Sequence, residues 1–177
     1  MPNRSEWDQH LRVSRPAVLD YWYRSSPNSL VSRNVKGRVQ WDDPPATEPG
    51  SVRLRLDPDG RLREFVAVPL ATGVDPAIDA TPPAPDPNQA DTTPWTELLA
   101  AAGLNIGDFK AVPPARLPTR FADRRAALVG AYPDSGVPIR IEMAALGSTP
   151  VAFRIIEQRF LDQAGPPPPR DRKTGRT

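Results

Sequence analysis

Residues 137–157 read VPIRIEMAALGSTPVAFRIIE, and this stretch carries the clearest structural signal in the chain. Apolar side chains alternate with other residues from Val137 to Met143, and the alternation resumes from Val151 to Ile155. Side chains of a β-strand point to opposite faces in turn, so a period of two predicts strands with one buried face. Gly147 lies in the break between the two runs, and the stretch therefore predicts an antiparallel hairpin.

A second hairpin is predicted between residues 52 and 68. Apolar residues alternate with arginines from Val52 to Leu56, and apolar residues return on one face from Leu62. The four residues 57–60 between the runs read Asp-Pro-Asp-Gly, in which proline presets φ at the second position and glycine takes the last. We expect turn formation to account for both aspartates, and we expect the arginines of the first strand to face solvent.

A short amphipathic helix is predicted from Trp95 to Ala102. Pro94 suits a first helical position after Thr93 as N-cap, and Gly103 suits the end of the helix. Apolar residues recur at helical spacing between these limits, so the helix has one face that must pack on another element. The hairpin sheet is the expected surface for that packing.

A third strand is predicted at residues 126–132, directly before the hairpin at 137–157. These elements together predict an α+β fold. Its sheet would be two antiparallel hairpins or a small meander, with the one short helix packed on one face.

The patterns in the rest of the chain are weaker. Pro16 predicts the first turn of a short helix, which would end at residues 25–28 and bury the aromatic residues 21–23 against the body of the protein or a partner surface. The apolar residues within 30–41 predict a weak strand. Residues 110–119 are interrupted by prolines, and no helix or strand is predicted there.

The expected domain organisation follows from the prolines, of which the chain has 24. Several lie within residues 69–93, separated by Asp, Ala and Thr, so we expect an extended internal linker that cannot bury enough apolar area to fold. Residues 1–15 are predicted to form a flexible N-terminal arm, and residues 166–177 a disordered basic tail. A single α+β domain is then expected over residues 16–165.

The composition excludes several kinds of chemistry. The chain has no cysteine, which rules out disulfides, thiolate nucleophiles and cysteine-ligated metals. Its formal net charge is +2 without a basic patch that contains aromatic residues, so nucleic-acid binding is not expected. No apolar run approaches the roughly 18 residues that span a bilayer. No apolar signal segment follows Met1, and we expect a soluble chain.

Candidate catalytic groups are few. The single histidine, His10, has no visible orienting partner, and neither a Gly-x-Ser-x-Gly serine nor a phosphate-binding loop occurs. Asp42 and Asp43 precede two prolines, and Asp57 and Asp59 flank a turn proline, so a hydrolase that uses carboxylates alone is the third alternative for the function. We expect no catalytic residue, no cofactor and no metal site.

Several short blocks follow one another in a familiar order. The blocks are residues 21–30, 37–39, 43–45, 49–50, 52–57, 60–62, 95–104 and 121–127. In these blocks the chain resembles a soluble segment of membrane-bound bacterial serine/threonine protein kinases, particularly of acidobacterial type, over most of residues 20–157. That segment lies next to transmembrane helices and outside the kinase domain. Here no membrane helix precedes Tyr21, and the His-Arg-Asp, Asp-Phe-Gly and strand-lysine motifs of the kinase domain are absent.

The resemblance implies a non-catalytic sensor or binding module on the extracytoplasmic side of a bacterial membrane, with an unidentified ligand or protein partner. It supplies no catalytic residue. We expect contacts through Trp22, Tyr23, Arg24 and Trp41, because aromatic residues and arginine dominate recognition energetics, although core packing is the commoner role for such residues. The alternative is a structural spacer or a protein–protein interaction domain that positions its neighbours.

Overall fold

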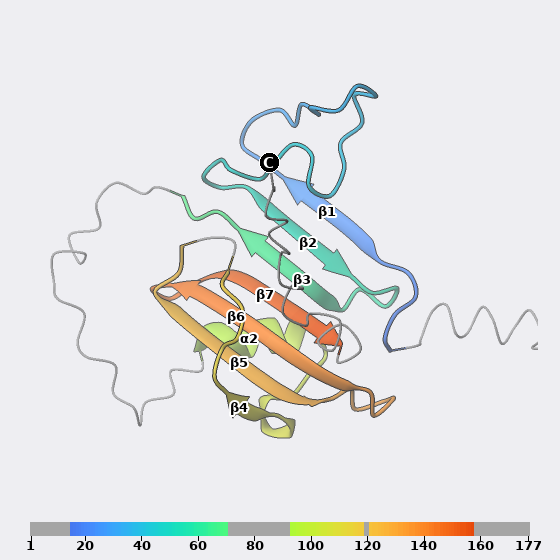
Figure 1. Cartoon of the computed structure of the whole chain (residues 1–177), viewed down its shortest axis with the longest axis vertical. Helices are drawn as coiled ribbons and strands as arrows, with labels where there is room; N and C mark the ends of the chain where they lie inside the picture. Colours follow the sequence, from blue (N-terminus) through green and yellow to red (C-terminus); the bar gives the residue numbers. More distant parts are fainter. Residues whose placement is uncertain (1–14, 71–92, 119–120, 158–177) are drawn as a thin grey trace, which may run out of the picture.

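The computed structural model describes residues 15–70, 93–118 and 121–157. These residues form one open, antiparallel sheet with a short helix on one face, so the fold class is α+β with a dominant sheet (Figure 1). The strand order in the sheet is β1-β2-β3-β7-β6-β5-β4. The elements are β1 (Tyr21–Ser25), β2 (Val52–Leu56), β3 (Leu62–Ala67), α2 (Thr93–Ala101), η2 (Ile106–Asp108), β4 (Lys110–Val112), β5 (Arg124–Ala131), β6 (Pro138–Leu146) and β7 (Thr149–Glu157).

The hairpin predicted at residues 137–157 is confirmed as β6 and β7. Leu146 pairs with Thr149, so only two residues form the loop. The first of them, Gly147, has a φ of +57°, and no described residue other than glycine, Ser148 included, has a positive φ, which identifies a type II′ turn. The side chains of Ile141 and Phe153 are fully buried, as the alternation predicted.

The hairpin of β2 and β3 is also confirmed, and its turn has the expected chemistry. The amide of Gly60 donates to the carbonyl of Asp57 at 2.9 Å, and Gly60 has a φ of +79°. β3 then pairs with β7 through Phe65 and Phe153, residues far apart in the sequence. Because this pairing joins the two hairpins into one continuous sheet, a description as two hairpins understates the sheet.

The helix α2 ends as its sequence predicted. Gly103 has a φ of +64°, the Leu104 amide donates to the Leu99 carbonyl at 2.9 Å, and the Gly103 amide donates to the Ala100 carbonyl at 2.9 Å. These two bonds form a Schellman motif, which satisfies carbonyls at the helix end. The described part of the helix begins at Thr93, and the N-cap role of Thr93 stays a prediction.

The apolar face of α2 packs on one face of the sheet, and this contact forms the core. Trp95 and Leu99 of the helix cluster with strand residues that include Ile141 and Phe153. The exposed fraction of Leu99 is 1%, so the helix is anchored firmly. The opposite face of the sheet, here called the open face, carries no helix in the part of the chain that the structure describes (Figure 1).

The short helix predicted from Pro16 is wrong, because residues 21–25 form the strand β1. Tyr23 pairs with Leu54 of β2, whose outer edge would otherwise lack backbone partners. Aromatic residues favour strands, and the free edge of β2 decides between strand and helix. Burial of residues 21–23 against the body of the protein is wrong as well, since the side chains of Tyr21, Trp22 and Tyr23 are 61%, 47% and 57% exposed. Burial against a partner surface stays a prediction.

Two further expectations are corrected. The weak strand predicted at residues 30–41 is a loop, in which Asp43 accepts hydrogen bonds from the backbone amides that a strand would direct elsewhere. Residues 110–112, for which no element was predicted, form the edge strand β4, which pairs with β5 through Ala111 and Leu128. Prolines at 113 and 114 limit β4 to three residues.

The predicted arm at residues 1–15, linker at 69–93 and tail at 166–177 lie almost wholly outside the described residues. Among the residues that are described, no helix is long and apolar enough to cross a membrane.

Candidate functional site

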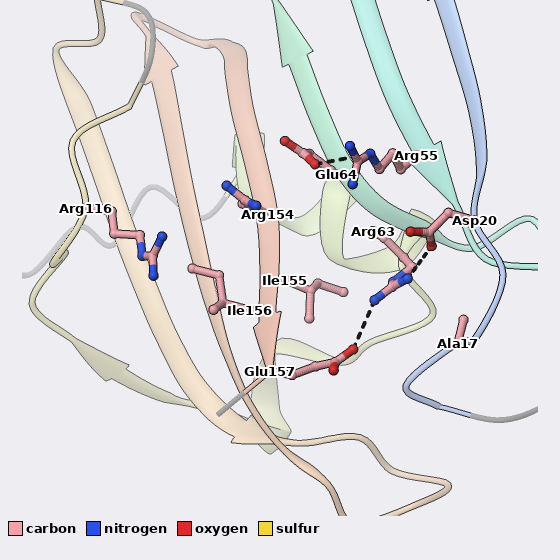
Figure 2. Close-up of a pocket in the computed structure, with 10 residues that line it drawn as sticks. All are labelled: Ala17, Asp20, Arg55, Arg63, Glu64, Arg116, Arg154, Ile155, Ile156 and Glu157. Carbon is pink, nitrogen blue, oxygen red and sulfur yellow. Dashed lines mark hydrogen bonds and ion pairs between the residues drawn. The ribbon is translucent and has the colours of Figure 1, made fainter. Parts of the chain in front are cut away.

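Two adjoining hollows lie on the open face of the sheet, and together they form what we call the open-face groove. Their volumes are about 440 and 310 Å³. Figure 2 shows the residues around the larger one. Both hollows are lined by Arg55, Glu64, Arg116, Arg154 and Ile156.

One wall of the groove is built by Trp41, which belongs to the loop between β1 and β2. The guanidinium carbons of Arg53 and Arg55 lie 4.8 and 4.3 Å from the centre of its ring. Arg53 also donates to the Trp41 carbonyl at 3.4 Å. Arginine stacks well on indole because the ring face is negative, so these contacts fix the ring against β2. The prediction that the β2 arginines simply face solvent is therefore only partly right.

The loop that carries Trp41 is tied to the sheet by Arg24. The exposed fraction of Arg24 is 9%, and its Nη1 donates to the Gln40 carbonyl at 2.6 Å. Its Nη2 donates to the Pro44 carbonyl. These bonds use the guanidinium to hold two loop carbonyls, so the structure gives Arg24 a structural role.

Asp43 organises the same loop from within. Its carboxylate accepts from the hydroxyl of Ser32 at 2.6 Å and from the amides of Arg33 and Asn34 at 2.9 and 3.1 Å. The Ser32 hydroxyl and these amides stabilise the ionised form and lower the pKa of Asp43 to about 2. The loop therefore depends on an ionised Asp43.

The other wall of the groove is the segment that follows β4. Arg140 of β6 donates from Nη2 to the Pro113 carbonyl at 2.5 Å, and the Ala115 amide donates to Glu142 Oε1 at 3.2 Å. Arg140 Nε and Glu142 Oε1 are 2.5 Å apart. This ion pair on β6 holds the backbone of the segment over the open face and so positions Arg116.

The floor between the walls is apolar and comes from the central strands. Val66 of β3, Ala144 of β6 and Ile156 of β7 are 6%, 2% and 5% exposed, and they line the smaller hollow with Ala152. A floor of small and branched apolar side chains leaves room for an extended ligand. It favours a ligand with some apolar surface of its own.

The smaller hollow of the groove has an excess of positive charge. Five arginines and three carboxylates line the smaller hollow. Glu64 lies 3.6 Å from Arg55, and Glu142 is paired with Arg140. Within the described residues, no hydrogen bond or ion pair engages the side chain of Arg116, Arg125 or Arg154.

Figure 2 shows how two of these arginines lie: Arg154 projects from β7, and Arg116 from the segment after β4, neither with an interaction drawn to another lining residue. Arg125 lines the smaller hollow from β5. An arginine held at a hollow without a carboxylate partner is a ready donor for an anion, because its planar guanidinium presents parallel N–H groups.

The far end of the larger hollow is charged but internally satisfied. Arg63 bridges Asp20 and Glu157, with its Nη2 3.0 Å from Glu157 Oε1 (Figure 2). Burial acts to lower the pKa of Arg63, and Asp20, with smaller contributions from Tyr132 and Glu157, outweighs that effect and raises it. The side chain of Glu157 is 2% exposed, so this bridge is a structural ion pair at the end of the sheet.

Asp57 and Asp59 stabilise the turn between β2 and β3 and bind the side chain of Arg61. Asp57 Oδ1 accepts from the amides of Asp59 and Arg61 at 3.0 and 2.9 Å, and Asp57 Oδ2 accepts from Arg61 Nε at 2.8 Å. Asp59 also binds Arg61. No cluster of three or more potential metal ligands occurs among the residues that the structure describes.

The four residues predicted for ligand contact fall in different places. Trp41 lies in the groove wall, whereas Trp22 and Tyr23 lie on the exposed edge strand β1 and Arg24 is buried under the loop. The structure thus brings no more than one of the four into the groove. Sequence reasoning missed Arg116, Arg125 and Arg154, although the alternation in β7 already puts Arg154 on the face opposite Phe153.

The chain was compared with protein-family models, with curated proteins and with solved structures, and none of them matches it.

Proposed function

We propose that this chain is a non-catalytic binding module, and that the open-face groove is its ligand site. The observation that carries the proposal is the set of three arginines, Arg116, Arg125 and Arg154, that line an apolar-floored hollow without a partner among the described residues. Arginines on three separate segments can converge on one anion. The ligand is therefore an anion, bearing carboxylate or phosphate groups, with a small apolar portion for the floor.

The placement in a cell rests on the sequence resemblance alone. We propose a sensor segment associated with a membrane-bound bacterial serine/threonine kinase, exposed on the extracytoplasmic side. Such a module acts by having different affinity for its ligand in two arrangements of the chain. The groove suits that role, because its walls are two long loops that a bound anion would bridge.

The groove carboxylates give little support to a hydrolase. A pair of acids that works on a glycosidic bond must be free to take or give a proton. Glu142 binds Arg140 and the Ala115 amide, and Glu64 lies beside Arg55. Two of the three carboxylates of the smaller hollow are thus accounted for structurally, which leaves Asp42 without a second free acid there.

A thermal-shift screen on the full chain tests the proposal. The panel holds citrate, inorganic phosphate, dodecanoate and a hexaglutamate peptide, each against sodium chloride at equal ionic strength. A ligand that binds only the folded state raises the midpoint by mass action. We expect at least one anion to raise it for the native chain and much less for the double variant Arg116→Gln/Arg154→Gln.

The matched control is Arg38→Gln, because Arg38 is an exposed loop arginine outside the groove. It should respond as the native chain does. A screen in which no anion shifts the native midpoint would support the structural spacer in place of a binding module. The separate arms for carboxylates and phosphate identify the anion.

A further inference from the structure

The sheet has two outer strands, and their free edges differ in how they are protected. β4 is three residues long, begins with Lys110 and is followed by two prolines, features that discourage pairing with another strand. β1 is five residues long and contains neither lysine nor proline. It lies at the other outermost position of the sheet (Figure 1). β1 is thus the edge open to strand addition.

The direction of the backbone groups on β1 follows from the neighbouring hairpin. The carbonyl of Ser51 accepts from the Val68 amide at 2.9 Å, so the backbone groups of Ser51 point toward β3. Backbone groups of successive strand residues point to alternate sides, so the amides and carbonyls of even-numbered β2 residues point toward β1. Leu54 pairs with Tyr23 and Leu56 with Tyr21. Hence Tyr21 and Tyr23 bond to β2, and Trp22 directs its amide and carbonyl outward.

In the part of the chain that the structure describes, the outward-pointing amide and carbonyl of Trp22 have no hydrogen-bond partner in any loop or side chain. The side chains around it are also uncovered. Tyr21, Trp22 and Tyr23 are 61%, 47% and 57% exposed, and the neighbouring Val18 and Leu19 are 68% and 46% exposed. Adjacent exposed aromatic and aliphatic residues on a free edge mark an interaction surface.

We propose that this edge binds a second copy of the same chain, through antiparallel pairing of β1 with β1 about a two-fold axis at Trp22. In this register Trp22 faces its own copy and the two exchange both backbone hydrogen bonds. Tyr21 lies opposite Tyr23 of the second copy, as a non-hydrogen-bonded pair whose side chains approach closely. Asp20 lies opposite Arg24 of the second copy, and each side chain keeps the partner it has within its own chain, Asp20 with Arg63 and Arg24 with the carbonyls of Gln40 and Pro44.

The other two-fold registers fit less well. An axis at Arg24 puts two arginines opposite each other, and like charges in that position are destabilising. An axis at Tyr23 puts Trp22 opposite Arg24 and leaves Tyr23 with Tyr23 as the one aromatic pair in the ladder. The axis at Trp22 alone sets aromatic against aromatic at three positions. A ladder this short gives a weak, concentration-dependent dimer.

Disulfide trapping tests this register directly, because the chain has no cysteine of its own. One full-length chain carries Tyr21→Cys and another, distinguished by a tag, carries Tyr23→Cys. In a non-hydrogen-bonded pair the Cα atoms are about 4.5 Å apart, within the range that a disulfide spans. Two equivalent positions in the proposed dimer are about 8 Å apart, too far for a disulfide, because they are offset by two residues along the strand.

We expect the mixture to form a mixed disulfide under mild oxidation, at a rate well above that of either chain alone. The control is Val35→Cys, a fully exposed loop position. Efficient crosslinking of Tyr23→Cys to itself would overturn the register. Crosslinking of the mixture no faster than the Val35→Cys control would overturn the dimer.

Sedimentation of the full chain without cysteines gives an independent reading. The weight-average mass of the native chain should rise with concentration toward twice 19.4 kDa. Trp22→Lys should remain monomeric, because it places like charges opposite each other. Val35→Lys, a charge added at an exposed site away from β1, should associate as the native chain does. A native chain that stays monomeric at every concentration would overturn the proposal.

Discussion

The guanidinium carbon of Arg55 lies 4.3 Å from the centre of the Trp41 ring, with Arg53 at 4.8 Å from the same ring. This contact joins a 26-residue loop, residues 26–51, to the second strand of the sheet. It also forms one wall of the open-face groove. A single aromatic side chain thus couples the order of the loop to the shape of the hollow.

Trp41→Ala should lower the free energy of unfolding by about 1–2 kcal/mol, because it removes two cation–π contacts at a half-buried site. Chemical denaturation of the two chains measures the difference. Trp41→Phe serves as the control, since it keeps an aromatic face and should lose less. Equal stabilities for Trp41→Ala and the native chain would show that the stacking contributes nothing.

Arg24→Met should loosen the loop rather than act on ligand contacts. It leaves the carbonyls of Gln40 and Pro44 without their donor, and losing bonds from a charged donor costs about 1.5–3 kcal/mol. Limited proteolysis should cut residues 26–51 faster in the variant. Proteolysis at the native rate, combined with loss of anion binding, would instead make Arg24 a contact residue.

The stability of the loop should depend on pH through Asp43. The pKa of its carboxyl is about 2 in the folded chain and 3.8 ordinarily, so the ionised form is favoured by folding. A group with a lowered folded pKa contributes stability that is present above the unfolded pKa and is lost as the pH falls through the folded pKa. The window is therefore from about pH 4 down to about pH 2.

Asp43→Asn makes this contribution measurable. The native chain should have the higher unfolding midpoint at neutral pH, and the difference between the two chains should stay constant down to about pH 5. It should then shrink as the pH approaches 2. A difference that does not change across this window would mean that Asp43 has an ordinary pKa in the folded chain.

Gly130 on β5 should not tolerate a side chain. A Cβ there would lie 2.5 and 2.8 Å from the Cδ1 and Cε1 atoms of Phe109, closer than carbon atoms approach. Overpacking of this kind costs about 1–3 kcal/mol. Gly130→Ala should therefore be destabilised in chemical denaturation.

The double variant Gly130→Ala/Phe109→Ala provides the control for that prediction. With the ring removed, the closest contacts of the added methyl group are gone and only the Asp108 carbonyl oxygen at 3.2 Å remains. The two substitutions together should therefore cost less than the sum of their separate costs. Strict additivity would show that Phe109 is not what restricts position 130.

The sequence predicted the elements whose formation depends on neighbouring residues alone. Alternation gave the β6–β7 hairpin, and Gly103 marked the end of α2. The strand β1 was mistaken for a helix, because its aromatic run fits either structure and the free edge of β2 decides between them. The pairing of Phe65 with Phe153 has no local signature, since it joins segments far apart in the sequence.

The groove was less predictable than the fold. Its walls are loops that are placed by single contacts, such as Arg140 with the Pro113 carbonyl. The sequence indicates that Arg154 lies on a strand face. Whether a carboxylate lies beside it depends on tertiary neighbours that alternation cannot predict. For this reason, the structure was needed to identify Arg116, Arg125 and Arg154 as candidate ligand-binding residues.

Calorimetric titration of the most effective anion from the screen into the native chain is the most direct test of the central claim, which is that the groove binds an anion through its arginines. We predict saturable binding to one site, weakened at least about tenfold in Arg116→Gln/Arg154→Gln, because charge-assisted bonds each contribute about 1.5–3 kcal/mol. Arg38→Gln should bind as the native chain does. Equal affinity in the native chain and the double variant would contradict the claim.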